Sequence, residues 1–350
     1  MPYSPVNKGT DFFRTKQYAG NGGSQSITFD ESSNFTPDFS WFKARSTTHS
    51  WAQIDRVRGV RKVISSDGTS TEYTETAALA SWDSNGFTFD GAGYYDVNFS
   101  GQTLNSYHWK LGGAASANSD GTLATQVSAN TTSGVSVATY TGTGSGGVTI
   151  GHGLGVKPKL CIIRRRGGTG ENFQTWYDNT GDGTSNRRLL LNGVASDYNN
   201  NHITFGTSTI TLPSSSDNGW SENSSNYVAW IFAEKTGFSA IKEYTGNGSV
   251  DGTFIYLGFK PAWAMVKQVT NDDRNWYVYD NKTSYNGSNK YLAVNENSEE
   301  GTLEWLDFLS NGIKIRNTSV GANKSGQAYL VVAFAEAPAV GSNNVPCTAR

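Results

Sequence analysis

Three glycines in this sequence have the spacing of a phosphate-binding loop. Gly142, Gly144 and Gly147 match the dinucleotide-binding fingerprint. That fingerprint must open a helix whose N-terminal amides meet the pyrophosphate. Here the β-branched segment Val148–Ile150 follows and predicts a strand. We therefore interpret these glycines as turn residues that supply positive φ angles.

A second candidate pattern resembles the start of a calcium-binding loop. Asp178, Thr180 and Asp182 alternate and are followed by Gly183. A working loop needs a bidentate glutamate at its twelfth position. That position is Leu189, so we interpret the segment as a turn rich in Asn, Asp and Gly.

Residues for catalysis or for a transition metal do not form a known pattern either. The four histidines show no His-Glu-x-x-His arrangement, and no Gly-x-Ser-x-Gly elbow is present. The two cysteines have no metal-binding spacing, and Cys161 lies within an apolar segment. We expect no catalytic, cofactor-binding or metal-binding residue, and so a protein that is not an enzyme.

The densest basic run is Arg164–Arg166. Its first member has counterparts at equal distance from a proline elsewhere in the chain, and each counterpart is followed by an aspartate. This spacing predicts a cross-strand ion pair at three places. A phosphate or anionic glycan site is the alternative. The predicted pairs are Lys43 with Asp55, Arg164 with Asp178 and Lys267 with Asp280.

Aromatic side chains are the remaining candidates for ligand contact. Trp220, Tyr94 and Tyr95 lie in segments rich in Gly, Asn and Ser, which are typical of exposed loops. Exposed aromatic rings there could stack on sugar rings, so these three residues are the possible ligand contacts. Packing within the loops is the alternative.

The chain contains one motif three times. Tyr-x-Gly-x-Gly begins at Tyr18, Tyr140 and Tyr244, and about 90 residues later each copy reaches an aromatic strand end at Trp109, Phe232 or Phe334. Between these landmarks each copy has a proline before an apolar strand, at Pro37, Pro158 and Pro261. The second copy departs from the Asn-Gly and Asn-x-Ser-Gly turns that the first and third copies share.

Composition gives these copies their predicted fold. The chain has 40 Gly, 10 Trp, 17 Tyr and 17 Phe, with frequent turn residues, which indicates short strands joined by tight turns. We expect an all-β protein with three tandem β-sandwich domains of one repeated, jelly-roll-like type. The predicted parts are an N-terminal tail (1–12), repeat 1 (13–112), a linker (113–134), repeat 2 (135–236), repeat 3 (237–337) and a C-terminal tail (338–350).

Charge and hydropathy limit the possible partners. The net charge is −2, which does not favour nucleic acid. No apolar stretch is long enough to cross a bilayer, and the N-terminus has no secretory h-region. We expect a soluble protein made in a cytoplasm, without membrane insertion.

Several segments together carry a resemblance to a known group of proteins. They are Val127–Thr132, Ile150–Pro158, Tyr244–Ser249, Gly258–Trp263, Ser310–Gly312, Asn323–Glu336 and Val345–Arg350. This combination resembles tandem-repeat proteins of tailed bacteriophages that infect marine bacteria, including cyanophages. The resemblance covers nearly the whole chain. It implies a virion structural component, tail or fibre-like, and it transfers no catalytic residue.

These observations lead to one expected function and two alternatives. We expect a non-enzymatic, surface-exposed tail or fibre component of a bacteriophage virion that takes part in host attachment and is assembled in the host cytoplasm. A capsid decoration or knob protein and a glycan-binding module are the alternatives. The expected partners are other virion proteins, reached through the terminal tails, and a host surface glycan or receptor. A homo-oligomer is left open, and no cofactor is expected.

Overall fold

The computed structural model describes residues 4, 6–93, 97–168, 170–184, 186–195, 201–215, 217, 219–270, 274–283, 286–287, 289–303 and 305–338. Their regular structure is β throughout, apart from one 3-10 turn, η1 (Gly9–Asp11), and these residues include no α-helix. The all-β class predicted from the sequence is confirmed.

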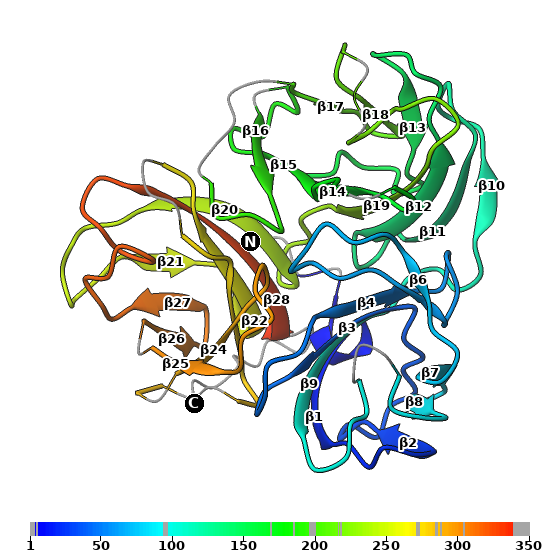
Figure 1. Cartoon of the computed structure of the whole chain (residues 1–350). Coiled ribbons are helices and arrows are strands. Elements are labelled where there is room, and N and C mark those ends of the chain that lie inside the picture. Colours follow the sequence, from blue (N-terminus) through cyan, green and yellow to red (C-terminus); the bar gives the residue numbers. More distant parts are fainter. Residues whose placement is uncertain are drawn as a thin grey trace.

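The strands fall into three consecutive groups, which surround a common centre (Figure 1). The first strand group contains β1 (Phe13–Ala19), β2 (Gln25–Thr28), β3 (Phe39–Ala44), β4 (Ala52–Asp55), β5 (Lys62–Val63), β6 (Tyr73–Thr74), β7 (Leu79–Asp83), β8 (Gly86–Phe89) and β9 (Thr103–Trp109). The second contains β10 (Ser116–Asn118), β11 (Thr125–Asn130), β12 (Val135–Thr141), β13 (Thr149–Gly151), β14 (Leu160–Arg165), β15 (Gln174–Asp178), β16 (Asn186–Leu190), β17 (Thr204–Phe205), β18 (Thr209–Thr211) and β19 (Asn226–Phe232). The third contains β20 (Ser239–Thr245), β21 (Phe254–Tyr256), β22 (Phe259–Gln268), β23 (Tyr277–Asp280), β24 (Lys290–Ala293), β25 (Gly301–Thr302), β26 (Leu306–Leu309), β27 (Gly312–Ile315) and β28 (Ala328–Pro338).

Each strand group builds one larger and one smaller sheet in the same strand order. The larger sheets contain the runs β1-β9-β3-β4, β12-β19-β14-β15 and β20-β28-β22-β23. The smaller sheets are β2-β8-β7, β13-β18-β17 and β21-β27-β26. The named strands pair antiparallel, and the register defines corresponding residues: Phe39 lies opposite Trp109, Leu160 opposite Phe232, and Trp263 opposite Phe334.

The Tyr-x-Gly-x-Gly motif is a turn in which the first glycine lies against backbone. A Cβ on Gly20 would lie 2.3 Å from the carbonyl oxygen of Phe99, and one on Gly142 would lie 2.3 Å from that of Glu222. The hydroxyl of the motif's buried tyrosine binds the same loop, as when Tyr140 donates to the carbonyl of Trp220 at 2.8 Å. The motif therefore joins the start of each strand group to the loop before its last strand.

The prolines stand at strand starts in two groups only. In the third group, β22 begins before Pro261, and the register of its pairing with β28 shifts on both sides of that proline. A bulge tolerates a residue that cannot donate to the ladder. The strand therefore passes through the proline.

The segment 113–134, predicted to be a linker, contributes two strands to a sheet instead. β10 pairs with β11, and β11 pairs with β12, which extends the second larger sheet to seven strands. Without this hairpin β12 would be an edge strand with unpaired backbone groups. The linker prediction was therefore wrong for these residues: the Ser, Thr and Gly content that suggested a linker belongs to a covering hairpin.

The described part of the N-terminal segment packs on its own chain. Val6 is fully buried in the central core, and the Ser4 hydroxyl donates to the carbonyl of Thr236 at 2.7 Å. This part is therefore not a free tail. Of the predicted C-terminal tail, only Pro338 is among the described residues, as the end of β28.

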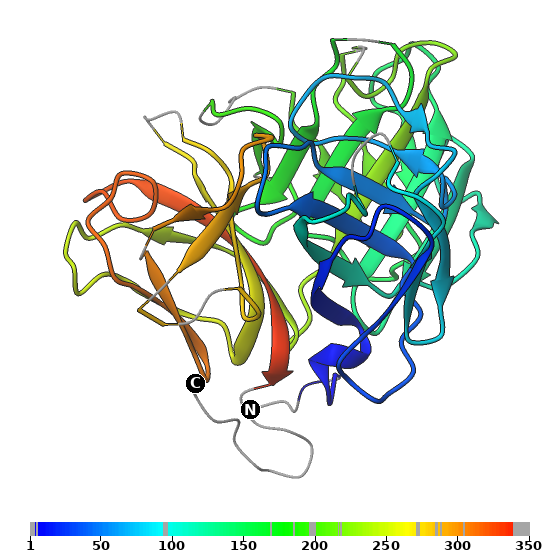
Figure 2. The same ribbon diagram turned by 60° about the horizontal axis from the view of Figure 1, so that its bottom comes forward.

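The three strand groups meet at aromatic residues of their last strands. β9 ends at Trp109 and β19 ends at Phe232, as predicted, whereas β28 continues past Phe334 to Pro338. The ring centroids of Trp109 and Phe334 lie 5.6 Å apart, those of Phe232 and Phe334 6.0 Å, and those of Trp109 and Phe232 6.4 Å. All three side chains are buried in one core cluster that draws residues from every group. Figure 2 shows the same arrangement of the groups from another direction. The aromatic landmarks that recur about 90 residues after each motif thus form the centre of the molecule.

Candidate functional site

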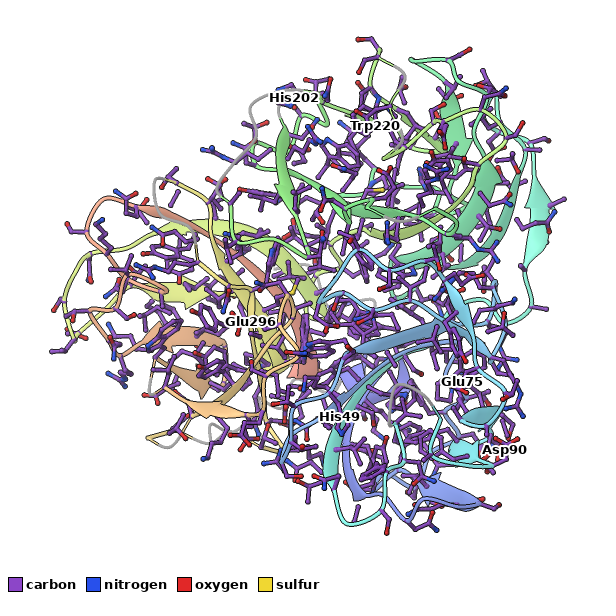
Figure 3. The ribbon with its side chains drawn as sticks, viewed as in Figure 1. His49, Glu75, Asp90, His202, Trp220 and Glu296 are labelled. Atoms are coloured by element: carbon purple, nitrogen blue, oxygen red, sulfur yellow. The ribbon has the colours of Figure 1, made fainter. Side chains whose placement is uncertain are left out.

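The structure tests one of the three aromatic residues predicted to contact a ligand. Trp220 is buried in the second strand group, where its indole donates to the carbonyl of Ser215 at 2.9 Å (Figure 3). The Arg188 guanidinium lies 5.3 Å from its ring centroid. Trp220 therefore packs a loop and offers no exposed ring for a sugar. Tyr94 and Tyr95 lie outside the described residues.

The three predicted cross-strand ion pairs do not form. Asp55 binds Arg58 at 2.6 Å instead, and Asp178 accepts hydrogen bonds from backbone amides such as that of Gly183 at 2.7 Å. The strand register explains this. Asp55 lies opposite Phe39 and Asp280 lies opposite Trp263, each four residues before the lysine of the predicted pair, and four residues of a strand span about 13 Å.

The basic side chains of these three predicted pairs instead join neighbouring strand groups. Lys43 donates to the carbonyl of Asn297 in the third group at 3.3 Å. Arg164 donates to that of Ser70 in the first group at 2.6 Å. Lys267 donates to that of Val194 in the second group at 2.8 Å. Burial lowers the pKa of Lys43 to about 8 and that of Arg164 to about 10.

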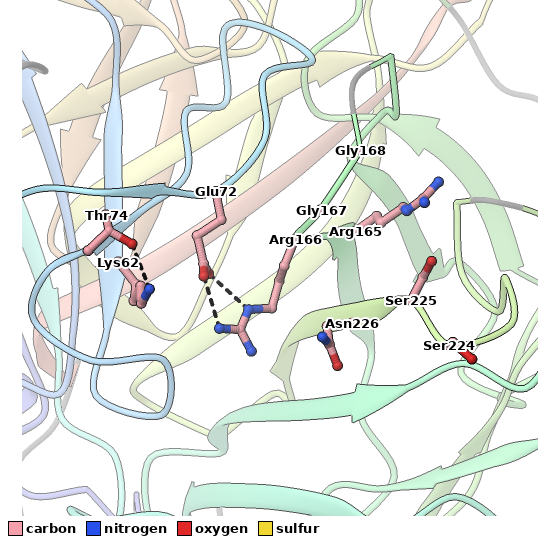
Figure 4. A pocket seen from close by; sticks show the side chains of 10 residues that line it. All are labelled: Lys62, Glu72, Thr74, Arg165, Arg166, Gly167, Gly168, Ser224, Ser225 and Asn226. Carbon is pink, nitrogen blue, oxygen red and sulfur yellow. Dashed lines mark hydrogen bonds and ion pairs between the residues drawn. The ribbon is translucent and has the colours of Figure 1, made fainter.

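A polar pocket of about 360 Å³ lies where the first and second strand groups meet (Figure 4). The first group supplies Lys62 of β5, Thr74 of β6 and Glu72 just before it. The second group supplies Arg165 and Arg166 at the end of β14. The pocket therefore uses the basic run that the sequence singled out, with a wall from another part of the chain.

The remaining wall comes from the glycine turn after β14 and from the loop before β19. Gly167 and Gly168 follow the arginines, and Ser224, Ser225 and Asn226 lie on the other side. Gly168 has a φ of 78°, which allows the chain to turn back immediately after the strand. The lining is therefore made of charged groups, hydroxyls, one amide and glycine backbone.

Glu72 holds the two sides of the pocket together. Its Oε2 accepts from Nε of Arg166 at 2.9 Å, and its Oε1 accepts from Nη2 of Arg166 at 2.9 Å. Arg58 adds a third contact at 3.3 Å. Burial alone would raise the pKa of Glu72, but the hydrogen bonds and charges of Arg166 and Arg58 outweigh burial and lower it. The carboxylate is therefore ionised at neutral pH and fully occupied by arginine.

The other two cations of the pocket are engaged differently. Lys62 donates to the hydroxyl of Thr74 at 2.6 Å and makes no ion pair with a described residue. Arg165 pairs with Glu222 and, at 3.5 Å, with Glu171. Its Nε is buried and has no hydrogen-bond partner among the described residues. Lys62 therefore retains capacity to bind another group, whereas Arg165 is held by two carboxylates.

Ser224 occupies a backbone conformation that favours glycine. Its φ is 60°, and its amide donates to the carbonyl of Gly142 at 2.9 Å. The corresponding residues are Gly101 and Gly326, with φ angles of 78° and 74°. Their amides make the same bond, to Gly20 at 3.2 Å and to Gly246 at 2.9 Å. Only the second strand group therefore places a side chain here, and that side chain lines the pocket.

Part of this arrangement recurs where the third and first strand groups meet. Lys290 donates to the hydroxyl of Thr302 at 2.7 Å, as Lys62 does to Thr74. Arg45 pairs with Glu300 at 2.6 Å, in the place of Arg166 with Glu72. In both places the glutamate amide also donates to the arginine carbonyl, at 2.8 and 2.9 Å. The lysine–threonine bond and the arginine–glutamate pair of the pocket therefore occur twice in the described part of the chain.

The sequence identified Arg164–Arg166 but missed the opposite wall of the pocket. Lys62, Glu72 and Ser224 form no sequence motif, because they come close together only when the strand groups pack. One signal was available. Ser224 stands eight residues before the strand end Phe232, as Gly101 and Gly326 stand before theirs.

One protein family matches most of this chain. The family described as "Domain of unknown function (DUF7483)" matches residues 8–338, which include all three strand groups. The chain belongs to this family. No curated protein and no solved structure matches it.

The DUF7483 chain has few other groups suited to chemistry in its described ranges. No three His, Cys, Asp or Glu side chains there lie close enough together to hold a metal ion. His108 lies between the hydroxyls of Ser40 and Ser106, each at 2.8 Å, and burial lowers its pKa well below the usual value. Burial also raises the pKa of the Cys161 thiol. Within the same ranges, no helix has the length and apolar character of a membrane span.

Proposed function

We propose that the DUF7483 chain is a non-enzymatic structural protein of a tailed-phage virion, exposed on the tail or a fibre and involved in host attachment. In this proposal the three strand groups are copies of one jelly-roll-like β-sandwich module. We propose that its partners are other virion proteins, and that it neither binds nucleic acid nor inserts into a membrane. The resemblance to phage repeat proteins and the shared strand order support it.

The observation that carries this proposal is the shared centre of the three strand groups. Trp109, Phe232 and Phe334 lie within 6.4 Å of one another by ring centroids. Buried aromatic pairs stabilise by about 0.5–1.5 kcal/mol beyond the burial of their area. One hydrophobic core shared by all three strand groups suits a component that must stay folded on the surface of a particle.

The location in the particle can be measured directly. Purified virions should contain the chain by mass spectrometry, and gold-labelled antibodies should mark the tail in electron micrographs. Label restricted to capsomers would replace the tail assignment by the alternative of a capsid decoration or knob protein. If purified virions lack the chain, the proposal of a virion protein is wrong.

A glycan-binding module is the second candidate, and one observation favours it. The pocket between the first and second strand groups is lined by hydroxyl, amide and charged groups, and none of its described lining residues is aromatic. Such a lining suits a polyhydroxylated ligand better than an apolar one. Binding to host polysaccharide would also serve attachment, so the two candidates are compatible.

A further inference from the structure

The pocket between the first and second strand groups has the size and lining of a small-ligand site. Its volume of about 360 Å³ falls within the range typical of such sites. Thr74, Ser224, Ser225 and Asn226 line it from two strand groups. A ligand that exchanges many hydrogen bonds with water, such as a sugar, loses least on entering such a lining.

Two residues that complete the pocket are specific to the second strand group. Arg165 occupies the position of Ala44 in the first group and of Gln268 in the third, opposite the corresponding residues of the last strands. Ser224 occupies the position of Gly101 and Gly326 at a positive φ. Its side chain is exposed, and its hydroxyl makes no hydrogen bond with a described residue. The backbone cost of Ser224 is therefore not offset by a bond within the fold.

The charges of the pocket favour a ligand that carries a carboxylate. Glu72 is saturated by Arg166 and Arg58, so it does not add an unpaired negative charge. Lys62 has only a hydroxyl partner, whereas Arg165 is already paired with Glu222 and Glu171 and its Nε is buried. A ligand carboxylate would therefore meet the ammonium group of Lys62, a charged donor that no described carboxylate occupies.

We propose that this pocket binds a uronate unit of an acidic polysaccharide, with Lys62 contacting its carboxylate and Ser224 contacting a hydroxyl. This inference depends on the proposed attachment role in one respect only: that role identifies the host surface as the source of the polysaccharide. The similar framework of Lys290, Thr302, Glu300 and Arg45 lacks the arginine and the serine, since Ala44 and Gly101 stand in their places. That second position is therefore not expected to bind the ligand.

Titration calorimetry with the full chain tests this proposal. The probes are trigalacturonate and an oligomannuronate, with maltotriose as a neutral sugar of similar size. We expect at least one uronate oligomer to bind at millimolar concentration or below and maltotriose to bind at least about tenfold more weakly, since one charge-assisted contact is lost. Absence of binding by both uronates, or equal binding by maltotriose, overturns the proposal.

Matched variants locate the binding to the pocket. Lys62→Met should weaken uronate binding by about tenfold, whereas Lys290→Met, which loses the corresponding lysine–threonine bond, should leave it unchanged. Ser224→Gly should weaken binding while the protein remains folded, as judged by its circular dichroism. An equal loss in both lysine variants, or unchanged binding in Ser224→Gly, contradicts the assignment. Failure here leaves the virion proposal intact, because particle composition is measured separately.

Discussion

Ser224→Gly should increase the stability of this protein. A left-handed conformation costs a non-glycine residue about 1–2 kcal/mol, and Ser224 has a φ of 60°. Glycine also stabilises the unfolded chain, by about 0.4–1 kcal/mol in conformational entropy. The difference predicts a gain of about 0.5–1 kcal/mol in the free energy of unfolding. No hydrogen bond of the serine hydroxyl to a described residue is lost in exchange.

The reverse substitution provides the control. Gly101→Ser and Gly326→Ser place a side chain at φ angles of 78° and 74°, and a Cβ at either position would meet no atom within 4 Å. Their cost is therefore conformational, again about 0.5–1 kcal/mol. Urea unfolding followed by tryptophan fluorescence measures all three variants. The reasoning is refuted if Ser224→Gly destabilises the protein or if both glycine variants leave its stability unchanged.

Three further predictions concern the core and the buried cations. Trp109→Ala should lower the free energy of unfolding by about 3–5 kcal/mol, and fluorescence and circular dichroism should still report one shared transition, because its ring contacts residues of both other strand groups. The folded pKa of Lys43 is about 8 against 10.5 in the unfolded chain. The unfolded state thus binds more protons between these values, and stability should rise with pH there, by up to about 3 kcal/mol relative to Lys43→Met. Burial lowers the pKa of His108 well below 6.5. Stability should therefore fall as pH drops below 6.5, by up to about 1.4 kcal/mol per pH unit, and urea titrations of His108→Gln should show a weaker dependence.

The sequence predicted the parts of the fold that depend on local spacing. The Tyr-x-Gly-x-Gly turns and the aromatic strand ends follow from close backbone approach and from burial, and both can be read along one chain. The linker prediction for the segment that contains β10 and β11 was wrong. Its polar residues look like a linker until the edge of β12 that they cover is known.

The candidate site was less predictable, because its residues come from different strand groups. Lys43 and Lys267 have the spacing of cross-strand ion pairs, yet their ammonium groups reach carbonyls of another group. The spacing also aligned Asp178 with Asp55 and Asp280, and the strand register shows that this alignment is wrong by one residue. Tyr177 lies opposite Leu160, as Asp55 lies opposite Phe39 and Asp280 opposite Trp263. Contacts between groups set both outcomes, and no local pattern records them.

The occupied glycine position has a consequence for stoichiometry. A ring of three identical chains would carry Ser224 three times, with three pockets and three strained turns. A single chain with three strand groups carries it once, so the proposed uronate contact through Ser224 would occur once per molecule. Strong adhesion through one weak contact per molecule then requires many molecules displayed together, where the effective concentration of neighbouring sites raises the avidity. The spacing of these chains on a surface would decide how tightly that surface holds.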